Sequence, residues 1–548
     1  MPSMMRIVVF VLACVFCSSY GRRVRTLAGR MQNHILPQGY NTFFISEISQ
    51  SLQLLCRAMQ PAGQASAKGK LNPQRPLSLL LQAIGTAAGF HCSSVGVQYS
   101  PPHNLENHFK FSKPQARLQA IDMLAQPTRP LKIRTVTTFI QLRPNEEDAW
   151  RTEITNAVGE NKVMRKLFEE AGYEVQTTRI STNPFGEFLA TSEPSEVARQ
   201  CRLLNTILTD AGAPEGPFGL LSLGPAISAE DVAMIPGIVA ISPRLFCCAQ
   251  ADLSNLRSEG VASDEDIRLA EAMGEAVRKV ADASAGDGCF QFCMMAGMPP
   301  LTPFFPASFA EPLNSQEVKS MRRCAVGLQF PQVVVEAFSA ADGSAQRARH
   351  LLMERCLSEF GSVQEILVSH EDDGVLKLPG LLTSLLYDGI DVSVAPSPDS
   401  RSLIEGFEAL LPSGSKFGQS GTLALSSMLS HALHEIRDGS RIRTVGYCGL
   451  MLPPLEDTGL AKRAAEGVLG IQQLMQYSAV CGLGLDCVPV PGDVSAVQLA
   501  QVYLDIAALS ARLGKPLSAR LFPVPGKAGG DIFTSDNPNL CDGAVFTL

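Results

Sequence analysis

From Leu131 to the C-terminus, apolar runs typical of strands alternate with segments whose apolar residues recur at helical spacing. The expected strands are 131–142, 237–242, 289–295, 325–329, 390–395, 443–452, 485–490 and 517–524. The expected helices are 146–172, 194–211, 264–283, 346–360, 402–411, 422–437 and 460–477. Repeated strand–helix units form either an α/β barrel or an open doubly wound sheet. The pattern therefore predicts one α/β domain over residues 131–548.

One short phrase occurs twice near the C-terminal end, at residues 489–492 and again at 523–526, both times as Pro-Val-Pro-Gly. Proline cannot donate to a strand ladder, so each copy is expected to end a strand. Between the copies, Ser495 with Gln498 forms a capping box and Gly514 ends a helix. The two strands should therefore be parallel, with both loops at one edge of the sheet, where ligands of such sheets bind.

The first 130 residues lack the clear strand and helix pattern of residues 131–548, the body of the chain. Arg6 precedes an apolar run at 7–17, and small or polar residues follow. Eleven apolar residues suit the core of a signal peptide, expected at residues 1–21, better than a membrane span. Residues 22–130 are expected to be a basic presequence and a loosely structured extension, and the start of this segment resembles a transit peptide. The chain is thus expected to enter the secretory pathway and to reach a plastid, or alternatively to be secreted or N-terminally anchored.

The composition and charge of the chain limit the classes of partner and the environment that can be expected for it. The 548 residues carry 46 Lys or Arg and 53 Asp or Glu, a formal net charge of −7, and the segment up to residue 126 is net basic whereas the remainder is net acidic. An acidic body without basic stripes argues against nucleic acid as a partner. The body contains no run long enough for a membrane-spanning helix. The 15 cysteines are scattered, many of them in apolar runs, which is typical of reduced, buried thiols.

Short segments of the body stand in an order that resembles a known family. They are Ile133-Arg134-Thr135-Val136-Thr137, residues 303–307, residues 389–396, Gly421-Thr422, Glu456-Asp457, residues 480–486, and Pro525-Gly526-Lys527 with Gly530-Asp531. Together they resemble domain of unknown function 711, an uncharacterised family. The resemblance implies a pyruvate formate-lyase-like α/β barrel, here behind an N-terminal targeting extension, and candidate site residues that include Gly421 and Thr422 for substrate binding.

The chain departs from the family pattern at three places. Ser420 stands where the family often has His, Cys448 stands where it has Ser, and residues 533–546 replace a glycine-rich tail. A glycyl radical is not expected. The nearest match to a radical motif, residues 443–447, has its valine shifted and lies well before the C-terminus.

Carboxylates are the main candidates for chemistry, because several lie on or beside the extended runs: Asp391, Glu456, Asp457, Asp486, Asp493 and Asp531. Gathered at one barrel mouth, they could bind a divalent cation or act as general acid and base. We assign Glu456, Asp457 and Asp486 to catalysis and the other three to substrate binding. The alternatives are structural: Asp493 can cap a helix, and Asp486 can pair with an arginine.

A thiol and a lysine complete the candidate site. Cys481 precedes Gly482-Leu483-Gly484 and would be a nucleophile if Lys527 or Arg520 lowered its pKa; otherwise it is an inert core thiol. Lys527 lies in a glycine-rich loop and suits a carboxylate or phosphate, or is a solvated surface lysine. His431 and His434 share a predicted helix, but a zinc site needs further ligands.

The sequence therefore predicts a non-radical enzyme acting on a small anionic metabolite at the loop face of the barrel. The alternative is a small-molecule-binding or regulatory protein on a degenerate enzyme barrel, and a third possibility is a scaffold without a ligand. A divalent cation is the one cofactor that the residues suggest, and a homo-oligomer is compatible with them.

Overall fold

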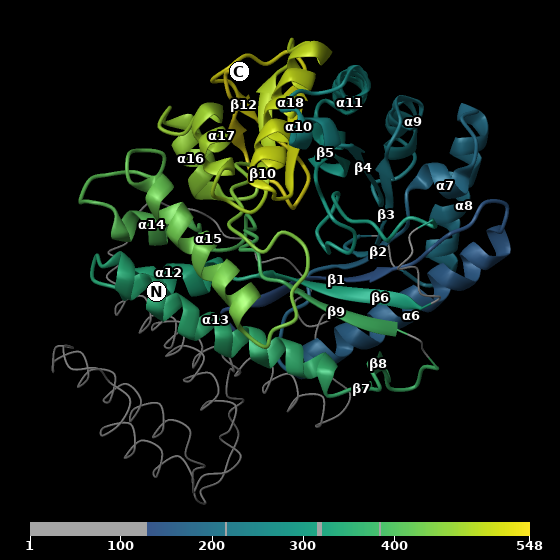
Figure 1. Ribbon diagram of the computed structural model, residues 1–548, viewed down its shortest axis with the longest axis horizontal. Coiled ribbons are helices and arrows are strands. Elements are labelled where there is room, and N and C mark those ends of the chain that lie inside the picture. Colours follow the sequence, from purple (N-terminus) through teal and green to yellow (C-terminus); the bar gives the residue numbers. More distant parts are fainter. Residues whose placement is uncertain (1–128, 214–215, 315–320, 383–384) are drawn as a thin grey trace, which may run out of the picture. The chain divides into compact units, whose positions relative to one another are not determined.

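The computed structural model describes residues 129–213, 216–314, 321–382 and 385–548 (Figure 1). The signal peptide expected at 1–21 lies outside the described residues, as does the basic segment from residue 22 to residue 128. Within the described part of the chain, no helix combines the length and the apolarity that crossing a bilayer requires.

The predicted α/β class is confirmed by a large, mostly parallel sheet. Its eleven strands follow the order β10-β11-β5-β4-β3-β2-β1-β6-β9-β8-β7. Strands β1 to β5 are parallel to one another, as are β6 with β9 and β10 with β11. These groups meet at two antiparallel pairs, β1 with β6 and β5 with β11. The sheet therefore consists of parallel blocks that run in opposite directions.

The strands of the large sheet are β1 (Lys132–Phe139), β2 (Thr178–Ser181), β3 (Phe218–Ala226), β4 (Leu245–Ala251), β5 (Phe292–Ala296), β6 (Arg322–Gln329), β7 (Glu371–Asp372), β8 (Val375–Leu376), β9 (Leu385–Asp391), β10 (Gly484–Pro491) and β11 (Leu517–Val524). A second, two-stranded sheet pairs β12 (Ile532–Phe533) with β13 (Gly543–Ala544).

The helices are α6 (Glu147–Glu170), α7 (Phe185–Leu189), α8 (Pro194–Asp210), α9 (Ala229–Val239), α10 (Ser254–Ser258), α11 (Asp264–Ser284), α12 (Pro331–Ser339), α13 (Ala345–Val368), α14 (Ile404–Leu410), α15 (Thr422–Gly439), α16 (Thr458–Ala465), α17 (Ile471–Ser478) and α18 (Ala496–Leu513), with a short 3-10 helix at Asp287–Gln291. Contacts run from α6 through α8, α9 and α11 to α18, and from α6 through α13, α15 and α17 back to α18 (Figure 1).

The strand–helix–strand unit that the duplicated phrase predicts is confirmed. Ser495 accepts a hydrogen bond from the amide of Gln498 at 3.2 Å and begins α18, and Gly514 ends it in the left-handed conformation. β10 and β11 are adjacent and parallel. The amide of Gly492 donates to the carbonyl of Lys527 at 2.9 Å, so the two Pro-Gly loops lie side by side.

Two of the expected strands are wrong. Residues 237–242 were expected to be extended because they form a short apolar run, but they overlap the end of α9. That helix begins upstream, where Ser228 accepts from the amide of Asp231 at 3.1 Å. Residues 443–452 do not form a continuous strand, because Gly446 and Cys448 both take a positive φ, which interrupts an extended backbone.

Residues 443–452 nevertheless touch the sheet. Thr444 bridges to Ile390 and Leu450 bridges to Val394, both in parallel orientation. On the other side, the amide of Gly482 donates to the carbonyl of Leu450 at 2.8 Å. The segment therefore connects the end of β9 with the segment that enters β10.

Candidate functional site

A cavity of about 970 Å³ lies among the strand ends of the large sheet. Its charged lining includes Arg134 of β1, Arg179 of β2, Arg520 of β11, Asp486 of β10 and Glu456 of the loop before α16. Each of these five side chains is less than a tenth exposed. These five side chains therefore bring three arginines and two carboxylates together in a part of the cavity largely removed from solvent.

Arg520 lies between the two carboxylates. Its Nε contacts Asp486 Oδ1 at 2.5 Å, and its Nη2 contacts Glu456 Oε1 at 2.7 Å. The register of β10 against β11 shifts between Leu485 and Val488, and Cys487 in this bulge has a φ of +47°. A bulge re-aims the side chains beside it. The predicted alternative that Asp486 pairs with an arginine is thus confirmed.

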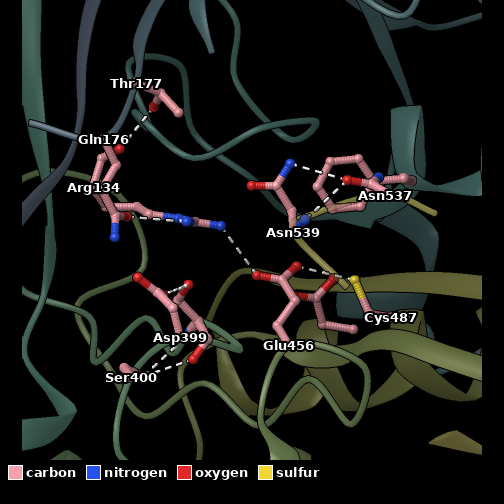
Figure 2. A network of polar contacts seen from close by, with 12 residues as sticks. Arg134, Gln176, Thr177, Asp399, Ser400, Glu456, Cys487, Asn537 and Asn539 are labelled. Carbon is pink, nitrogen blue, oxygen red and sulfur yellow. Dashed lines mark hydrogen bonds and ion pairs between the residues drawn. The ribbon is translucent and has the colours of Figure 1, made fainter. Parts of the chain in front are cut away.

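Arg134 extends the network across the sheet. Its Nη2 lies 3.4 Å from Glu456 Oε2, and its Nη1 donates to Gln176 Oε1 at 3.0 Å (Figure 2). The Cys487 thiol donates to Glu456 Oε1 at 3.1 Å. Burial raises the pKa of Cys487 well above its ordinary value, so this thiol stays protonated and acts as a hydrogen-bond donor.

Arg179 is bonded differently from the other two arginines. Its Nε donates to Thr177 Oγ1 at 3.1 Å, but among the described residues no carboxylate lies within ion-pair distance of its guanidinium. Burial lowers its pKa well below the ordinary value; Arg134 and Arg520 add to this effect, and Glu456 opposes it. Because the side chain lines the cavity and is only 7% exposed, it presents there a positive charge without an ion-pair partner among the described residues.

Asp486 is the carboxyl group of the cavity whose pKa is raised. Burial raises its pKa, Arg520 opposes this, and the neighbouring Glu456 adds to the rise. A carboxyl group whose pKa is raised toward the operating pH can serve as general base or acid.

Three side chains of this network are of the types that bind metal ions. Glu456, Asp486 and Cys487 offer three ligand atoms within 4.8 Å of one another. However, the Arg520 guanidinium already contacts both carboxylates, and the Cys487 thiol is held protonated, whereas a metal requires the thiolate. The donor set therefore fits a network centred on the Arg520 guanidinium better than one centred on a metal ion.

The C-terminal segment also contributes to the cavity. Asn537 and Asn539 line it, and Asn539 Nδ2 donates to Asn537 Oδ1 at 3.0 Å (Figure 2). The amide of Cys541 donates to the carbonyl of Leu455 at 2.7 Å, which fixes this segment beside Glu456. The tail that departs from the family pattern is therefore part of the cavity wall.

Several predicted site residues lie elsewhere and have local roles. Asp391 is buried and accepts from the amides of Tyr447 at 2.8 Å and Cys448 at 3.0 Å, which fixes the loop that follows Gly446. Cys481 is buried, and its Sγ accepts from the amide of Gly484 at 3.4 Å. Neither residue lines the cavity.

The loop residues that were expected to meet Asp486 are separated from it. Asp486 lies near the start of β10, whereas Asp493 follows the end of that strand, roughly 20 Å further along at the rise of a strand. Lys527 and Asp531 are exposed beside the second Pro-Gly loop, and none of the three lines the cavity. Gly421, with a φ of +100°, and Thr422, whose Oγ1 accepts from the amide of Gly418 at 3.1 Å, shape the start of α15.

Asp457 caps a helix. Its Oδ1 accepts from the amides of Gly459 at 2.8 Å and Leu460 at 3.1 Å, and its Oδ2 accepts from the amide of Leu403 at 2.9 Å. We expect Asp457→Ala to lower the free energy of unfolding by about 1–3 kcal/mol, because several buried amides lose their acceptor. Urea denaturation measures this loss. An unchanged midpoint would contradict the capping role.

The sequence reasoning missed the roles of Arg134 and Arg179 and noted Arg520 only as a possible neighbour of Cys481. A signal was present for Arg134 and Arg520, which stand beside apolar residues of their strands, Ile133 and Leu521, but not for Arg179, whose strand is Thr-Arg-Ile-Ser. A buried charge is costly unless it is paired, so an arginine in such a run indicates a partner or a ligand.

Comparisons with known proteins show the family to which the chain belongs. The model of the family described as "Uncharacterised ACR (DUF711)" matches residues 123–535. A UPF0210 protein from Methanopyrus kandleri is 27% identical over 437 residues, covering 76% of this chain and 90% of the relative. A UPF0210 protein from Oleidesulfovibrio alaskensis is 27% identical over 431 residues, with the same coverage, and one from Neisseria meningitidis is 26% identical over 428 residues, covering 76% and 89%. The predicted resemblance is confirmed: the chain belongs to the uncharacterised DUF711 family.

Proposed function

We propose that the cavity binds a small anionic metabolite and that the protein acts on it by proton transfer, without a radical. The observation that carries this proposal is Arg179. Its guanidinium faces the cavity without a carboxylate partner among the described residues. An unpaired buried charge is costly, and an anion supplied from outside would compensate it.

The neighbouring side chains would have distinct roles. Arg179 would hold the anion, because its fork of N–H donors matches a carboxylate or phosphate. Arg134 already pairs with Glu456 and would orient that carboxylate. Asp486, with its raised pKa, would move the proton, and Arg520 would stabilise its ionised form.

A binding or regulatory protein on the same scaffold is the second candidate. Ser420, which stands where the family often has His, favours it, because a lost side chain suits a degenerate enzyme. Both candidates require anion binding at Arg179, and only the first requires turnover. Turnover of a bound anion that Asp486→Asn abolishes would separate them.

We further propose that the large sheet closes into a pyruvate formate-lyase-like barrel around the cavity. The bridges of residues 443–452 to the end of β9, and the hydrogen bond from Gly482 to Leu450, support closure between β9 and β10. The circuit of helix contacts from α6 around to α18 and back supports it as well. A crystal structure in which β9 and β10 are separated by solvent would contradict closure.

A thermal-shift screen of the full chain with carboxylates, phosphate and divalent cations tests anion binding. A ligand at 100 times its Kd stabilises the folded state by about 2.7 kcal/mol, which raises the melting temperature measurably. We expect stabilisation by anions and the same response in Lys527→Ala, because Lys527 is exposed and lies outside the cavity. A screen without any anion response would contradict the proposal.

A further inference from the structure

Three phenylalanine rings line the cavity between Arg179 and Arg520. The Arg179 guanidinium lies 4.9 Å from the ring centroid of Phe305, and the Arg520 guanidinium lies 5.0 Å from that of Phe290. Phe246 connects the two rings, with its centroid 5.2 Å from Phe305 and 6.1 Å from Phe290. We call Phe246, Phe290 and Phe305 the aromatic wall, and all three line the cavity.

The position of the aromatic wall favours a ligand with two unlike parts. Arg179 is stacked beside Phe305, so an oxyanion bound to its free N–H groups places the rest of the ligand next to the wall. Aromatic side chains prefer to pack against other rings, edge to face or offset. A wholly polar ligand would leave the cavity-facing surface of these rings without an apolar contact from the ligand.

The charges in the cavity indicate how many negative groups the ligand carries. Of the arginines that line the cavity, Arg134 and Arg520 pair with Glu456 and Asp486, and Arg244 donates to Asn205 and Thr209. Arg179 has no carboxylate within ion-pair distance among the described residues, so it can hold one negative group. Three further carboxylates line the cavity, those of Glu174, Asp287 and Asp399, and Asp287 Oδ1 is buried without a hydrogen-bond partner among the described residues. A second negative group on the ligand would be repelled by these side chains.

We propose that the ligand is an aromatic monoanion, with its single oxyanion on Arg179 and its ring on the aromatic wall; this inference rests on the anion-binding function proposed above. A cavity of about 970 Å³ accommodates a ligand of one or two rings. Either a carboxylate or a phosphate monoester could supply the oxyanion, and the charge balance favours the carboxylate, which carries one charge.

Isothermal titration of the full chain with four carboxylic acids and with phenyl phosphate tests this inference. We expect 3-phenylpropionate to bind about tenfold or more tightly than propionate, and a few-fold more tightly than 3-cyclohexylpropionate, which has a similar size but no π-system. A second carboxylate on the phenyl ring, or phenyl phosphate in place of the acid, is expected to weaken binding. Phe246→Leu should lower the affinity for 3-phenylpropionate about fivefold and that for propionate by a smaller factor.

The outcomes separate the two proposals. If propionate and 3-phenylpropionate bind equally, and both lose affinity in Arg179→Met, the aromatic inference is overturned while anion binding stands. If 3-cyclohexylpropionate matches 3-phenylpropionate, the ring has no special role and the inference is also overturned. If none of the acids binds, anion binding fails together with the inference. The titrations of the wild-type protein test the inference even if the Phe246→Leu variant does not fold.

Discussion

Arg179→Met is expected to abolish stabilisation by anions while leaving the ligand-free protein at least as stable as the wild type. The two effects have one cause. The guanidinium is buried, its pKa is lowered mainly by that burial, and no carboxylate among the described residues pairs with it. An apolar side chain of similar length removes the unpaired charge, a change expected to stabilise the free protein by about 1 kcal/mol or more. It also removes the group that holds the anion.

The measurement is the melting temperature of both proteins with and without a saturating anion. Arg244→Met provides a matched control for the stability of the ligand-free protein, because Arg244 is also buried and also lines the cavity but donates to Asn205 at 2.9 Å and to Thr209 at 2.8 Å. The same substitution there should destabilise the protein by about 1–3 kcal/mol, because hydrogen bonds to a charged group are lost. A ligand-free Arg179→Met protein that is as strongly destabilised as Arg244→Met would show that Arg179 is structural.

Arg520→Met is expected to cause the largest loss of stability, about 3–5 kcal/mol at neutral pH. Arg520 contacts both Asp486 and Glu456, and its removal leaves Asp486 buried without an ion-pair partner. The loss should shrink as the pH falls. Burial already raises the pKa of Asp486, and Arg520 is the main influence that opposes this rise. Without Arg520 the folded-state pKa lies further above the unfolded one, so protonation below it relieves the penalty.

Urea denaturation of the wild type and Arg520→Met at pH 8 and pH 5.5 measures this dependence. The double variant Arg520→Met with Asp486→Asn is the matched control, since it removes the unpaired Asp486 charge together with the guanidinium. We expect the double variant to be more stable than Arg520→Met at pH 8, with a smaller dependence on pH. Equal losses at both pH values would indicate that Arg520 contributes packing and not charge compensation.

The sequence predicted those parts of the fold whose signals are local. α18 was found because Ser495, Gln498 and Gly514 specify its ends within the helix itself. β3 was missed because Gly219, Gly224 and Pro225 interrupt its apolar pattern, and pairing with β2 and β4 overrides those residues.

The candidate site could be predicted only in part. Glu456 and Asp486 were identified as candidates, because carboxylates at strand ends are visible in the sequence. The arginines that pair with them come from β1 and β11, and the third comes from β2. The order of strands in the sheet, set by long-range pairing, decides that these side chains meet. The bulge at Cys487 is a further feature that no local pattern indicates.

Soaking crystals of the protein in perrhenate, a monovalent oxyanion with a strong anomalous signal, tests the central claim most directly. The account predicts an anomalous peak inside the cavity, with its oxygens within hydrogen-bond distance of the Arg179 guanidinium. Anomalous peaks confined to the outer surface, with the cavity free of rhenium, would contradict it.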